Sequence, residues 1–386
     1  MRVLMIAPFP RNPDRIDGGV AAATMYLCQA LSAMPDVDLI GVRVARDGQD
    51  LPEEQSLGWP VVDLPLGRLS LSTLFMPQRR RLHELLLRYE PQVVHAQGAD
   101  FAGLLAVSCN RPAVVTAHGM LAECARFQTD PVNRLRASLS AAVTERTTIR
   151  RARDLIAISP YVARHYRDDI RGRIHELPNA IGPAYFDVER KPERGRFLFA
   201  GRIANGKGLE ELIRAAAGSS SAVKSLILAG ATPDGAYGER LRRMVSSLDL
   251  EDRVLFTGLL TEADLLNEFS RAEALVLPSH QETAPMVVQQ AMAAGLAVVA
   301  SDVGGIPDQI RHEVSGLLFA PGDERALASL FARLARDAAL SARLGDAAKR
   351  EATGRYRASA VAEGTRTVYR TALDPSASPR QLARIA

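Results

Sequence analysis

Short continuous runs of apolar residues recur along the whole chain, and segments with helical periodicity lie between them. Continuous apolar runs are typical of strands in parallel sheets that helices cover on both faces. Helical patterns such as 208–217 and 238–248 separate the runs, so the sequence predicts βαβ alternation in both halves of the chain. The predicted strands are 2–8, 37–44, 92–98, 113–119 and 155–159 in the first half, and 196–202, 225–230, 253–258, 274–279 and 297–301 in the second.

Most of the predicted strands end in glycine, serine, histidine or another small polar residue. In an open parallel sheet, ligands bind in the crevice beyond the carboxyl ends of the strands. The pattern therefore predicts an α/β fold in which two Rossmann-like domains face a central cleft, and it places the candidate chemistry at the strand ends.

The length of 386 residues exceeds what one ordinary hydrophobic core holds, so two domains are expected. The segment 177–196 is rich in proline, glycine and charge, and we place the boundary within it. We expect an N-terminal domain over 1–182 and a C-terminal domain over 183–354, which the family resemblance given below implies to be the acceptor and the donor domain. The helical stretch 355–372 could pack on either domain, including back on the first, and 373–386 is predicted to be a flexible tail.

Composition places the chain among globular proteins, with 47% apolar and 24% charged residues. No apolar run reaches the roughly 18 to 20 residues of a membrane helix, and the N-terminal apolar run is too short for a signal peptide. The net charge is only +4, which gives no indication of nucleic-acid binding. Three cysteines (Cys28, Cys109 and Cys124) form no metal-ligand spacing and suit a reducing compartment. We expect a cytoplasmic protein.

A glycine-rich turn follows the predicted strand 196–202. It contains Arg202 and Lys207 and leads through Gly208 into a helix. Glycines let backbone amides approach a ligand, and a helix N-terminus favours anions. With a guanidinium and an ammonium beside them, these groups suit a diphosphate. The spacing is not that of a Walker A loop, and an ordinary βα turn with solvated cations explains the stretch equally well.

The segment 279–305 carries a second candidate site. Glu282 follows the strand 274–279 and could accept hydrogen bonds from sugar hydroxyls, and Pro285 favours a helix over 286–295. Gln290 lies one turn into that helix, and its uncharged amide can both donate and accept. The alternative is that Glu282 caps the helix and that Gln290 is a buried polar residue bonded to backbone.

The first half offers weaker candidates. Gly19 stands before a predicted helix, where free amides face the strand ends, but the stretch lacks a GxGxxG fingerprint. His118 ends a strand and precedes a glycine, a position that favours a site over the usual structural role of a lone histidine. His95 has a similar position and is the lesser candidate. The acids Asp36 and Asp38 enter a strand rather than leave one, so we predict no metal site there.

Two basic amphipathic segments, 79–89 and 134–153, have arginine-rich faces. Such faces can rest on anionic lipid. A solvated helix face is the commoner explanation and is the one favoured here. Peripheral contact with the inner face of the cell membrane is kept as an alternative.

Taken in order, several motifs resemble the retaining GT-B glycosyltransferases of the family called glycosyl transferases group 1. In the second half the likeness rests on GRIANGKGLEELIRA, LILAG, RVLFTG, LPSHQET, QAMAAGLAVVASDVGGIPDQI and SGLLFAPGD, and covers nearly all of it. The first half is similar more loosely, through GGV, VVHAQG, TAHG, AISPYVARHY and LPNAIGPAYF. The resemblance implies two Rossmann-like domains, with the donor nucleotide sugar held mainly by the second.

The resemblance also implies roles for individual residues. Arg202 and Lys207 would grip the donor diphosphate, Glu282 would hold hydroxyls of the transferred sugar, and His118 would lie beside the sugar and the reacting centre. These four are the expected catalytic residues. The other implied donor contacts are phosphate for Gly19 and for the amides of Met286 and Val287, the nucleobase for Leu260, and the ribose hydroxyls for Gln290.

Two departures from the family pattern concern the donor site. The family usually has a glutamate where Gln290 stands, and it commonly has an aromatic-glycine pair where this chain has Ala284 and Pro285. Because charge-assisted hydrogen bonds are roughly twice as strong as neutral ones, a glutamine should hold ribose less firmly. Pro285 has no N–H, so one sugar contact at that position is lost.

The resemblance implies a retaining, metal-independent transferase that moves a hexose-type sugar from a nucleotide-diphosphate sugar to an acceptor hydroxyl. UDP is the first expectation for the nucleotide and GDP the second, with no cofactor and no metal. A lipid-linked sugar, a growing polysaccharide or a small molecule could be the acceptor, and synthesis of surface polysaccharide or glycolipid is the expected setting. Two alternatives stay open: a non-catalytic protein that binds a nucleotide sugar or a partner, and a sugar-nucleotide epimerase.

Overall fold

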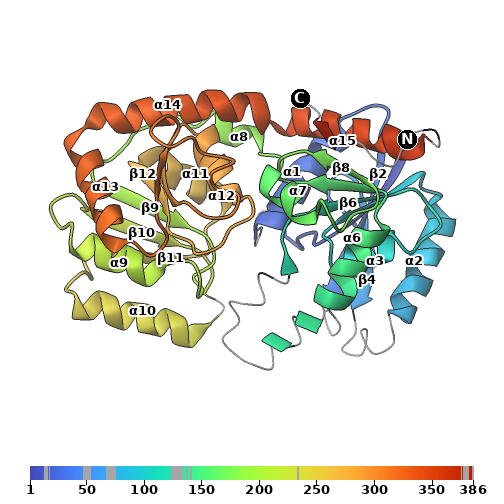
Figure 1. Ribbon diagram of the computed structural model, residues 1–386, viewed down its shortest axis with the longest axis horizontal. Helices are drawn as coiled ribbons and strands as arrows, with labels where there is room; N and C mark the ends of the chain where they lie inside the picture. Colours follow the sequence, from blue (N-terminus) through green and yellow to red (C-terminus); the bar gives the residue numbers. More distant parts are fainter. Residues whose placement is uncertain are drawn as a thin grey trace. The chain divides into compact units, whose positions relative to one another are not determined.

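The computed structural model describes residues 1–12, 16, 18–46, 54–66, 75–121, 123, 134–135, 138–139, 141–232, 234–374, 376 and 382–384. The chain forms two compact α/β units. Unit 1 consists of Met1–Pro13, Val20–Ala180 and Ala358–Ala386, and unit 2 of Asp14–Gly19 and Ile181–Arg357. Figure 1 shows each unit as a sheet with helices on both of its faces.

The sheet of unit 1 has nine strands in the order β15-β8-β7-β6-β5-β1-β2-β4-β3. Neighbouring strands are parallel, except that β3 runs antiparallel to β4. Because β5 returns to the other side of β1, the strand order reverses between these two strands. The strands are β1 Arg2–Ala7, β2 Asp38–Arg46, β3 Glu54–Ser56, β4 Pro60–Leu66, β5 Val93–Gln97, β6 Ala113–Ala117, β7 Asp154–Ala157, β8 Arg173–Glu176 and β15 Leu382–Arg384.

Helices of unit 1 bury the apolar strands. One hydrophobic cluster joins residues of β1, β2, β4 and β5 to α2 and α3, and includes Leu4, Ile6, Leu82, Leu85 and Leu105. The described helices of this unit are α1 Gly19–Ser32, α2 Met76–Tyr89, α3 Phe101–Ala106, the π-helix η1 Ala141–Glu145, α6 Arg146–Arg151, α7 Pro160–Tyr166 and α15 Ala358–Leu373.

The sheet of unit 2 has six parallel strands in the order β11-β10-β9-β12-β13-β14. This order reverses between β9 and β12, which makes that pair the topological switch point of the sheet. Figure 1 shows α9, α10 and α13 on one face and α11 and α12 on the other. The strands are β9 Arg196–Ala200, β10 Ser225–Ala229, β11 Val254–Gly258, β12 Ala274–Leu277, β13 Ala297–Ser301 and β14 Leu317–Phe319. The helices are α8 Pro183–Phe186, α9 Leu209–Ala217, α10 Gly235–Ser247, α11 Glu262–Arg271, α12 Met286–Ala293, α13 Glu324–Arg336 and α14 Ala338–Arg355.

Every strand predicted from the apolar runs is present, with ends that differ by at most two residues. Two Rossmann-like α/β units are therefore confirmed. The pattern misses β3, β8, β14 and β15, which have three or four residues each, and β4, whose apolar residues are interrupted by Asp63 and two prolines. In β8, for example, Arg173 and His175 are buried because both bind the Asp154 carboxylate, at 2.7 and 2.8 Å. An apolar pattern cannot reveal a strand that is buried through ion pairing.

The C-terminal segment returns to unit 1. Helix α15, predicted as 355–372, packs against β5 and β6. Leu382–Arg384, which lie in the segment predicted to be a flexible tail, form β15 and pair with β8. None of the helices in the described part of the chain is both long and apolar enough to cross a bilayer.

Candidate functional site

The glycine-rich turn after β9 lies against the end of β12, at the switch point of unit 2. The amide of His280 donates to the Gly206 carbonyl at 2.9 Å. Gly208, which precedes α9, has φ +66°, and a Cβ there would lie 2.1 Å from the Pro278 carbonyl oxygen. Only glycine fits this position, because other residues would meet both the backbone strain and the clash. The two strand ends are thereby held together.

Lys207 and Glu282 meet across these two strand ends. The Lys207 Nζ donates to Glu282 Oε1 at 2.6 Å, and Ser279 Oγ donates to the same oxygen at 2.8 Å. The side chains of Lys207 and Glu282 are 25% and 12% exposed. A cation and a carboxylate that are both partly accessible at a switch point can bind an anionic, hydroxyl-bearing ligand. The structure thus brings together two of the residues selected from the sequence.

Arg202 lies in the same turn and is exposed. Within the described part of the chain its guanidinium has no ion-pair partner, whereas Lys207 is neutralised by Glu282. A guanidinium without a counter-ion is available for a phosphate, to which it can donate two parallel hydrogen bonds. Arg202 therefore supplies the uncompensated positive charge of this site.

A third glycine turn fixes the backbone of Glu282. Gly304, which follows β13, has φ +55°, and a Cβ there would lie 1.9 Å from the Glu282 carbonyl oxygen. The Gly305 amide donates to that same oxygen at 3.0 Å. The predicted turn 301–305 therefore has a defined task, which is to hold the peptide of Glu282 beside β13.

Helix α12 begins at Met286, directly after Pro285, as the sequence predicts. Met286 and Val287 occupy its first turn, where backbone N–H groups have no acceptor within the helix. Gln290 lies one turn further and is 7% exposed. The backbone amides of Met286 and Val287 and the side chain of Gln290 thus belong to one helix, which begins shortly after Glu282. The Gln290 side chain is, however, deeply buried.

The remaining donor-site candidates lie further apart. Leu260 is half-buried and follows β11, the edge strand of the sheet. Gly19 is the first residue of α1 and belongs to unit 2, and a Cβ on it would lie 3.6 Å from Met286 Cγ. Gly19 is therefore next to the first turn of α12, while Leu260 is at the opposite side of β10 from the β9 turn.

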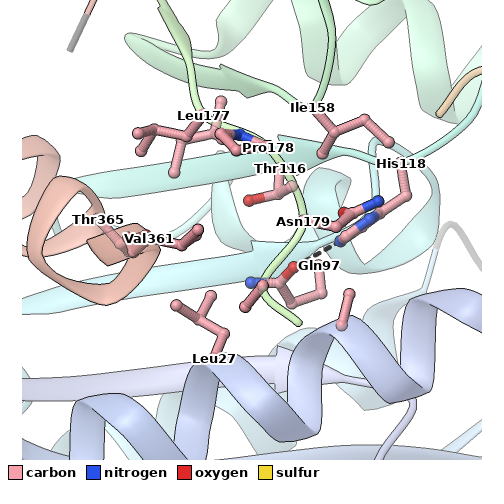
Figure 2. Close-up of a pocket in the computed structure, with 13 residues that line it drawn as sticks. Leu27, Gln97, Thr116, His118, Ile158, Leu177, Pro178, Asn179, Val361 and Thr365 are labelled. Atoms are coloured by element: carbon pink, nitrogen blue, oxygen red, sulfur yellow. Dashed lines mark hydrogen bonds between the residues drawn. The ribbon is translucent and has the colours of Figure 1, made fainter. Parts of the chain in front are cut away.

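His118 is the first residue beyond β6 and belongs to unit 1. Its Nε2 lies 2.6 Å from Gln97 Oε1, at the end of the neighbouring strand β5, and its side chain also hydrogen-bonds with Asn179. Figure 2 shows these three side chains converging at one end of a small pocket that Leu27 of α1 and Val361 and Thr365 of α15 also line.

The pocket beside His118 has a volume of about 20 Å³. A cavity of this size holds about one water molecule and no sugar ring. Burial lowers the pKa of His118 to about 4, although the hydrogen bond with Asn179 opposes this shift. His118 is therefore a neutral imidazole near pH 7, in which one ring nitrogen donates a hydrogen bond and the other accepts one.

His95 is a buried structural member of the same network. It is fully buried, and its Nδ1 and Nε2 lie 2.7 Å from Tyr369 Oη and from Thr116 Oγ1. Burial, together with the nearby His118, lowers the pKa of His95 to about 3. The sequence analysis ranks His95 below His118, and the structure gives it no exposed atom with which to meet a ligand.

Sequence reasoning missed the residues that support these sites. Ser279 holds Glu282, and its position at the end of a predicted strand, three residues before the acid, was an available signal. Gln97 holds His118 and stands in the motif VVHAQG, so it too could have been found. Tyr369 carries no such signal, because its 274-residue separation from His95 is bridged only in the folded chain.

Both halves of the chain match known family models. Residues 184–351 match the family described as glycosyl transferases group 1, and residues 17–185 match the one described as Glycosyltransferase Family 4. Each half of the chain thus matches a family of glycosyltransferases. Together with the fold, these matches support a group 1 glycosyltransferase.

Curated relatives point the same way. The chain is 31% identical to the alpha-maltose-1-phosphate synthase of Mycobacterium tuberculosis, over 50% of this chain and 52% of the relative. It is 32% identical to the D-inositol 3-phosphate glycosyltransferase of Kineococcus radiotolerans, over 47% of this chain and 46% of the relative. The chain thus spans about half the length of the curated relatives it matches.

Solved structures show the same GT-B fold. The sucrose-phosphate synthase of Thermosynechococcus elongatus aligns over 96% of this chain and 98% of its own, with a TM-score of 0.79 and 23% identity. HepE of Anabaena, in complex with UDP-glucose, aligns over 95% of this chain and 99% of its own, with a TM-score of 0.72 and 19% identity. The family matches and the fold thus both support a group 1 glycosyltransferase built of two Rossmann-like units.

Proposed function

We propose that this chain is a retaining, metal-independent glycosyltransferase that moves a hexose-type sugar from a nucleotide-diphosphate sugar to an acceptor hydroxyl. The observation that carries the proposal is the ion pair of Lys207 and Glu282, 2.6 Å long, at the switch point of unit 2. Ligands of such sheets bind at this point. The pair there combines a donor for phosphate oxygens with an acceptor for sugar hydroxyls.

The donor would exchange the contacts within this pair for contacts with itself. Diphosphate oxygens would accept from Lys207 Nζ and from the exposed Arg202, and sugar hydroxyls would donate to Glu282. Ser279 would keep its hydrogen bond to Glu282 Oε1 and so hold the carboxylate in place. A preformed pair lowers the cost of ordering both side chains when the ligand arrives.

The negative charge that develops on the departing diphosphate raises the activation free energy, and the site can lower this free energy by stabilising that charge. As the anomeric C–O bond breaks, negative charge gathers on the diphosphate, and Arg202, Lys207 and the first-turn amides of α12 stabilise it. The acceptor hydroxyl attacks from the face that the diphosphate leaves, and its proton passes to a departing phosphate oxygen. The new bond then has the configuration of the old one.

In this scheme Arg202 and Lys207 stabilise the diphosphate charge that a divalent metal ion would otherwise stabilise, so transfer should persist in the presence of a chelator. His118 would contact the sugar near the reacting carbon through its neutral ring. UDP is the proposed nucleotide and GDP the alternative. The complexes of the structurally similar HepE with UDP and with UDP-glucose support UDP as the first choice.

Peripheral membrane contact is a second proposal, and it rests on a separate observation. Leu135, Leu139 and Val143 follow one another at intervals of four and are 62%, 53% and 43% exposed. The exposed Arg146 and Arg150 continue the same segment. Apolar side chains beside arginines suit an anionic lipid surface. The contact would be supported if the protein sediments with anionic but not with zwitterionic vesicles and if Leu139→Gln abolishes this sedimentation. If the protein sediments with neither kind of vesicle, the contact is excluded.

Transfer by Lys207→Ala and Arg202→Ala variants tests the main proposal. With UDP-sugars and a panel of sugar and lipid-linked acceptors, in EDTA, we expect each change to slow transfer by about 100-fold, the usual cost of losing one transition-state charge partner. Lys191→Ala and Arg80→Ala are matched controls, because these cations are 69% and 87% exposed. Unchanged rates in the site variants would overturn the proposal, and an anomeric NMR signal of inverted product would overturn retention.

A further inference from the structure

The first turn of α9, which follows the Lys207 turn directly, carries two carboxylates. They belong to Glu210 and Glu211. Acidic side chains at this end of a helix stabilise the helix, because they interact favourably with its N-terminal partial positive charge. Beside a site for a diphosphate, however, the same negative charges repel the ligand. The turn can therefore hold a diphosphate firmly only if these carboxylates are compensated by other groups.

Helix α10 supplies the partners of Glu210. Its Oε1 accepts from Arg240 Nη2, and its Oε2 accepts from the Tyr237 hydroxyl at 2.6 Å. Tyr237 and Arg240 are three residues apart on α10, so their side chains lie on the same face of that helix. Figure 1 shows α10 beside α9 on one face of the sheet of unit 2. Both carboxylate oxygens of Glu210 are therefore bonded by one neighbouring helix.

The two partners of Glu210 differ in charge. Burial raises the pKa of the Tyr237 hydroxyl, and the hydrogen bond to Glu210 raises it further, so Tyr237 stays neutral. Burial also opposes the ionisation of Glu210, but the hydrogen bonds from Tyr237 and Arg240 outweigh burial and lower the pKa of this carboxyl. Glu210 is thus ionised near pH 7, and the guanidinium of Arg240 supplies the positive charge beside it.

Arg240 also contacts the glycine-rich turn itself. The Nη2 atom that bonds Glu210 lies 3.4 Å from Oδ1 of Asn205, two residues before Lys207. One nitrogen atom thus places the Glu210 carboxylate next to the turn that carries Arg202 and Lys207. Because charges interact strongly at short range, the compensation of Glu210 affects any anion that binds to this turn.

Other groups near the first turn of α9 have partners of their own. Arg214, one turn further along the helix, pairs with Glu324 of α13. His280 Nε2 lies 3.1 Å from Oε1 of the second carboxylate, that of Glu211. Arg240 is therefore the cation that the fold assigns to the first carboxylate.

We propose that Arg240 is a positioning residue of the donor site that acts through Glu210. It neutralises this carboxylate, and the turn with Arg202 and Lys207 can then bind a diphosphate without repulsion from α9. The inference rests on the proposed function, because it concerns the diphosphate of the donor. Arg240 itself makes no contact with the ligand in this account.

Calorimetric titration of UDP, GDP and inorganic pyrophosphate, in EDTA, tests the proposal in wild type and Arg240→Met. At about 20 mM salt we expect the variant to bind the diphosphate that wild type prefers about fivefold more weakly, because a carboxylate near the ligand is then unpaired. At about 0.5 M salt the loss should shrink to less than about twofold, since mobile ions screen the repulsion. Arg243→Met is the matched control, because Arg243 is an exposed arginine of the same helix and its loss removes the same charge.

A double-mutant cycle with Glu210→Gln separates charge compensation from two other roles of Arg240. In the Glu210→Gln background Arg240→Met should have no effect, because no carboxylate is left to compensate. If Arg240 contacted the phosphates instead, its loss would weaken binding in both backgrounds. Tyr237→Phe removes a neutral hydrogen bond from Glu210 and should leave the affinity unchanged at both salt concentrations. A loss equal to that of Arg240→Met would show that packing of α10 is responsible rather than charge.

The outcomes separate this inference from the proposed function. Equal affinities of wild type and Arg240→Met, or a loss that persists in the Glu210→Gln background, would overturn the inference even if the protein transfers sugar. If Arg240→Met does not fold, Arg240→Gln takes its place in the cycle. Diphosphate binding without transfer to any acceptor would overturn the proposed function and leave the inference in place. Absence of binding to all three probes would overturn both.

Discussion

The ammonium of Lys207 lies 2.6 Å from the carboxylate of Glu282, a residue 75 positions away in the chain. The contact forms because β9 and β12 are neighbours in the sheet and the turns after them are locked together by Gly208 and the Pro278 backbone. Neither side chain is deeply buried, so both remain open to a ligand. The pair is the centre of the proposed donor site.

Glu282→Gln should leave the fold intact and slow sugar transfer. The amide has the same shape, but it loses the charge-assisted bonds to Lys207 and to the donor's hydroxyls, so kcat/KM should fall by about 100-fold. Initial rates with saturating acceptor measure the effect. Glu189→Gln is the matched control, because Glu189 pairs with Lys191 on the surface, where both side chains are more than two-thirds exposed. Equal rates in the two variants would show that Glu282 has no part in transfer.

Gln290→Glu should tighten nucleotide binding if Gln290 contacts the ribose. A carboxylate acceptor strengthens the hydrogen bonds from ribose hydroxyls by about 1 to 2 kcal/mol, which is about 5- to 30-fold in Kd. Calorimetric titration of UDP, GDP and ADP into both proteins checks this. The neighbouring Gln289, 1% exposed, provides Gln289→Glu as a control that should bind no more tightly. Weaker binding in Gln290→Glu would place this residue away from the ribose.

Acid should destabilise unit 1 through His118 and His95. The pKa values of His118 and His95 fall from 6.5 to about 4 and about 3 on folding. The unfolded chain therefore binds protons first as pH falls below 6.5, and the native state does not follow until about pH 4. In that window each histidine removes up to about 1.4 kcal/mol of stability per pH unit, and above pH 6.5 neither has an effect.

Urea unfolding at pH 7, 6 and 5 measures this dependence. His95→Gln should reduce the loss between pH 7 and pH 5, whatever its effect on stability at pH 7. His83→Gln is the matched control, because His83 is exposed on α2. A pH dependence that is the same in wild type and His95→Gln would contradict the assignment of His95 as a buried neutral ring.

Gly208→Ala and Gly354→Ala should have opposite effects. At Gly208 a methyl group meets the Pro278 carbonyl at 2.1 Å and the backbone has φ +66°, so the variant should lose about 2 to 4 kcal/mol of stability along with donor binding. Gly354 lies in α14 with nothing within 4 Å of an added Cβ, so alanine there should gain up to about 1 kcal/mol. Thermal unfolding with and without nucleotide compares them, and a neutral Gly208→Ala would show that the β9 turn tolerates movement.

The sequence by itself determined the class of fold and the location of the proposed donor site. Continuous apolar runs identify central parallel strands because both faces of such strands are buried. Arg202, Lys207 and Glu282 follow these runs directly, so their place at the strand ends could be predicted without knowing the sheet order. The three-residue strands β3, β14 and β15 escape the pattern because they are so short, and β4 escapes it because Asp63 and two prolines interrupt its apolar residues. Strand β8 escapes it because Arg173 and His175 are buried through their bonds to Asp154.

Only the tertiary structure decided which of these residues act together. The pairing of Lys207 with Glu282 depends on β9 and β12 being adjacent, and strand order is set by the packing of helices on the sheet rather than by local pattern. The network from His118 through Gln97 and His95 to Tyr369 depends on α15 returning to unit 1 after the whole of unit 2. Hydrogen bonds between residues so far apart leave no periodic trace in the sequence, because each partner satisfies the other only once the chain has folded.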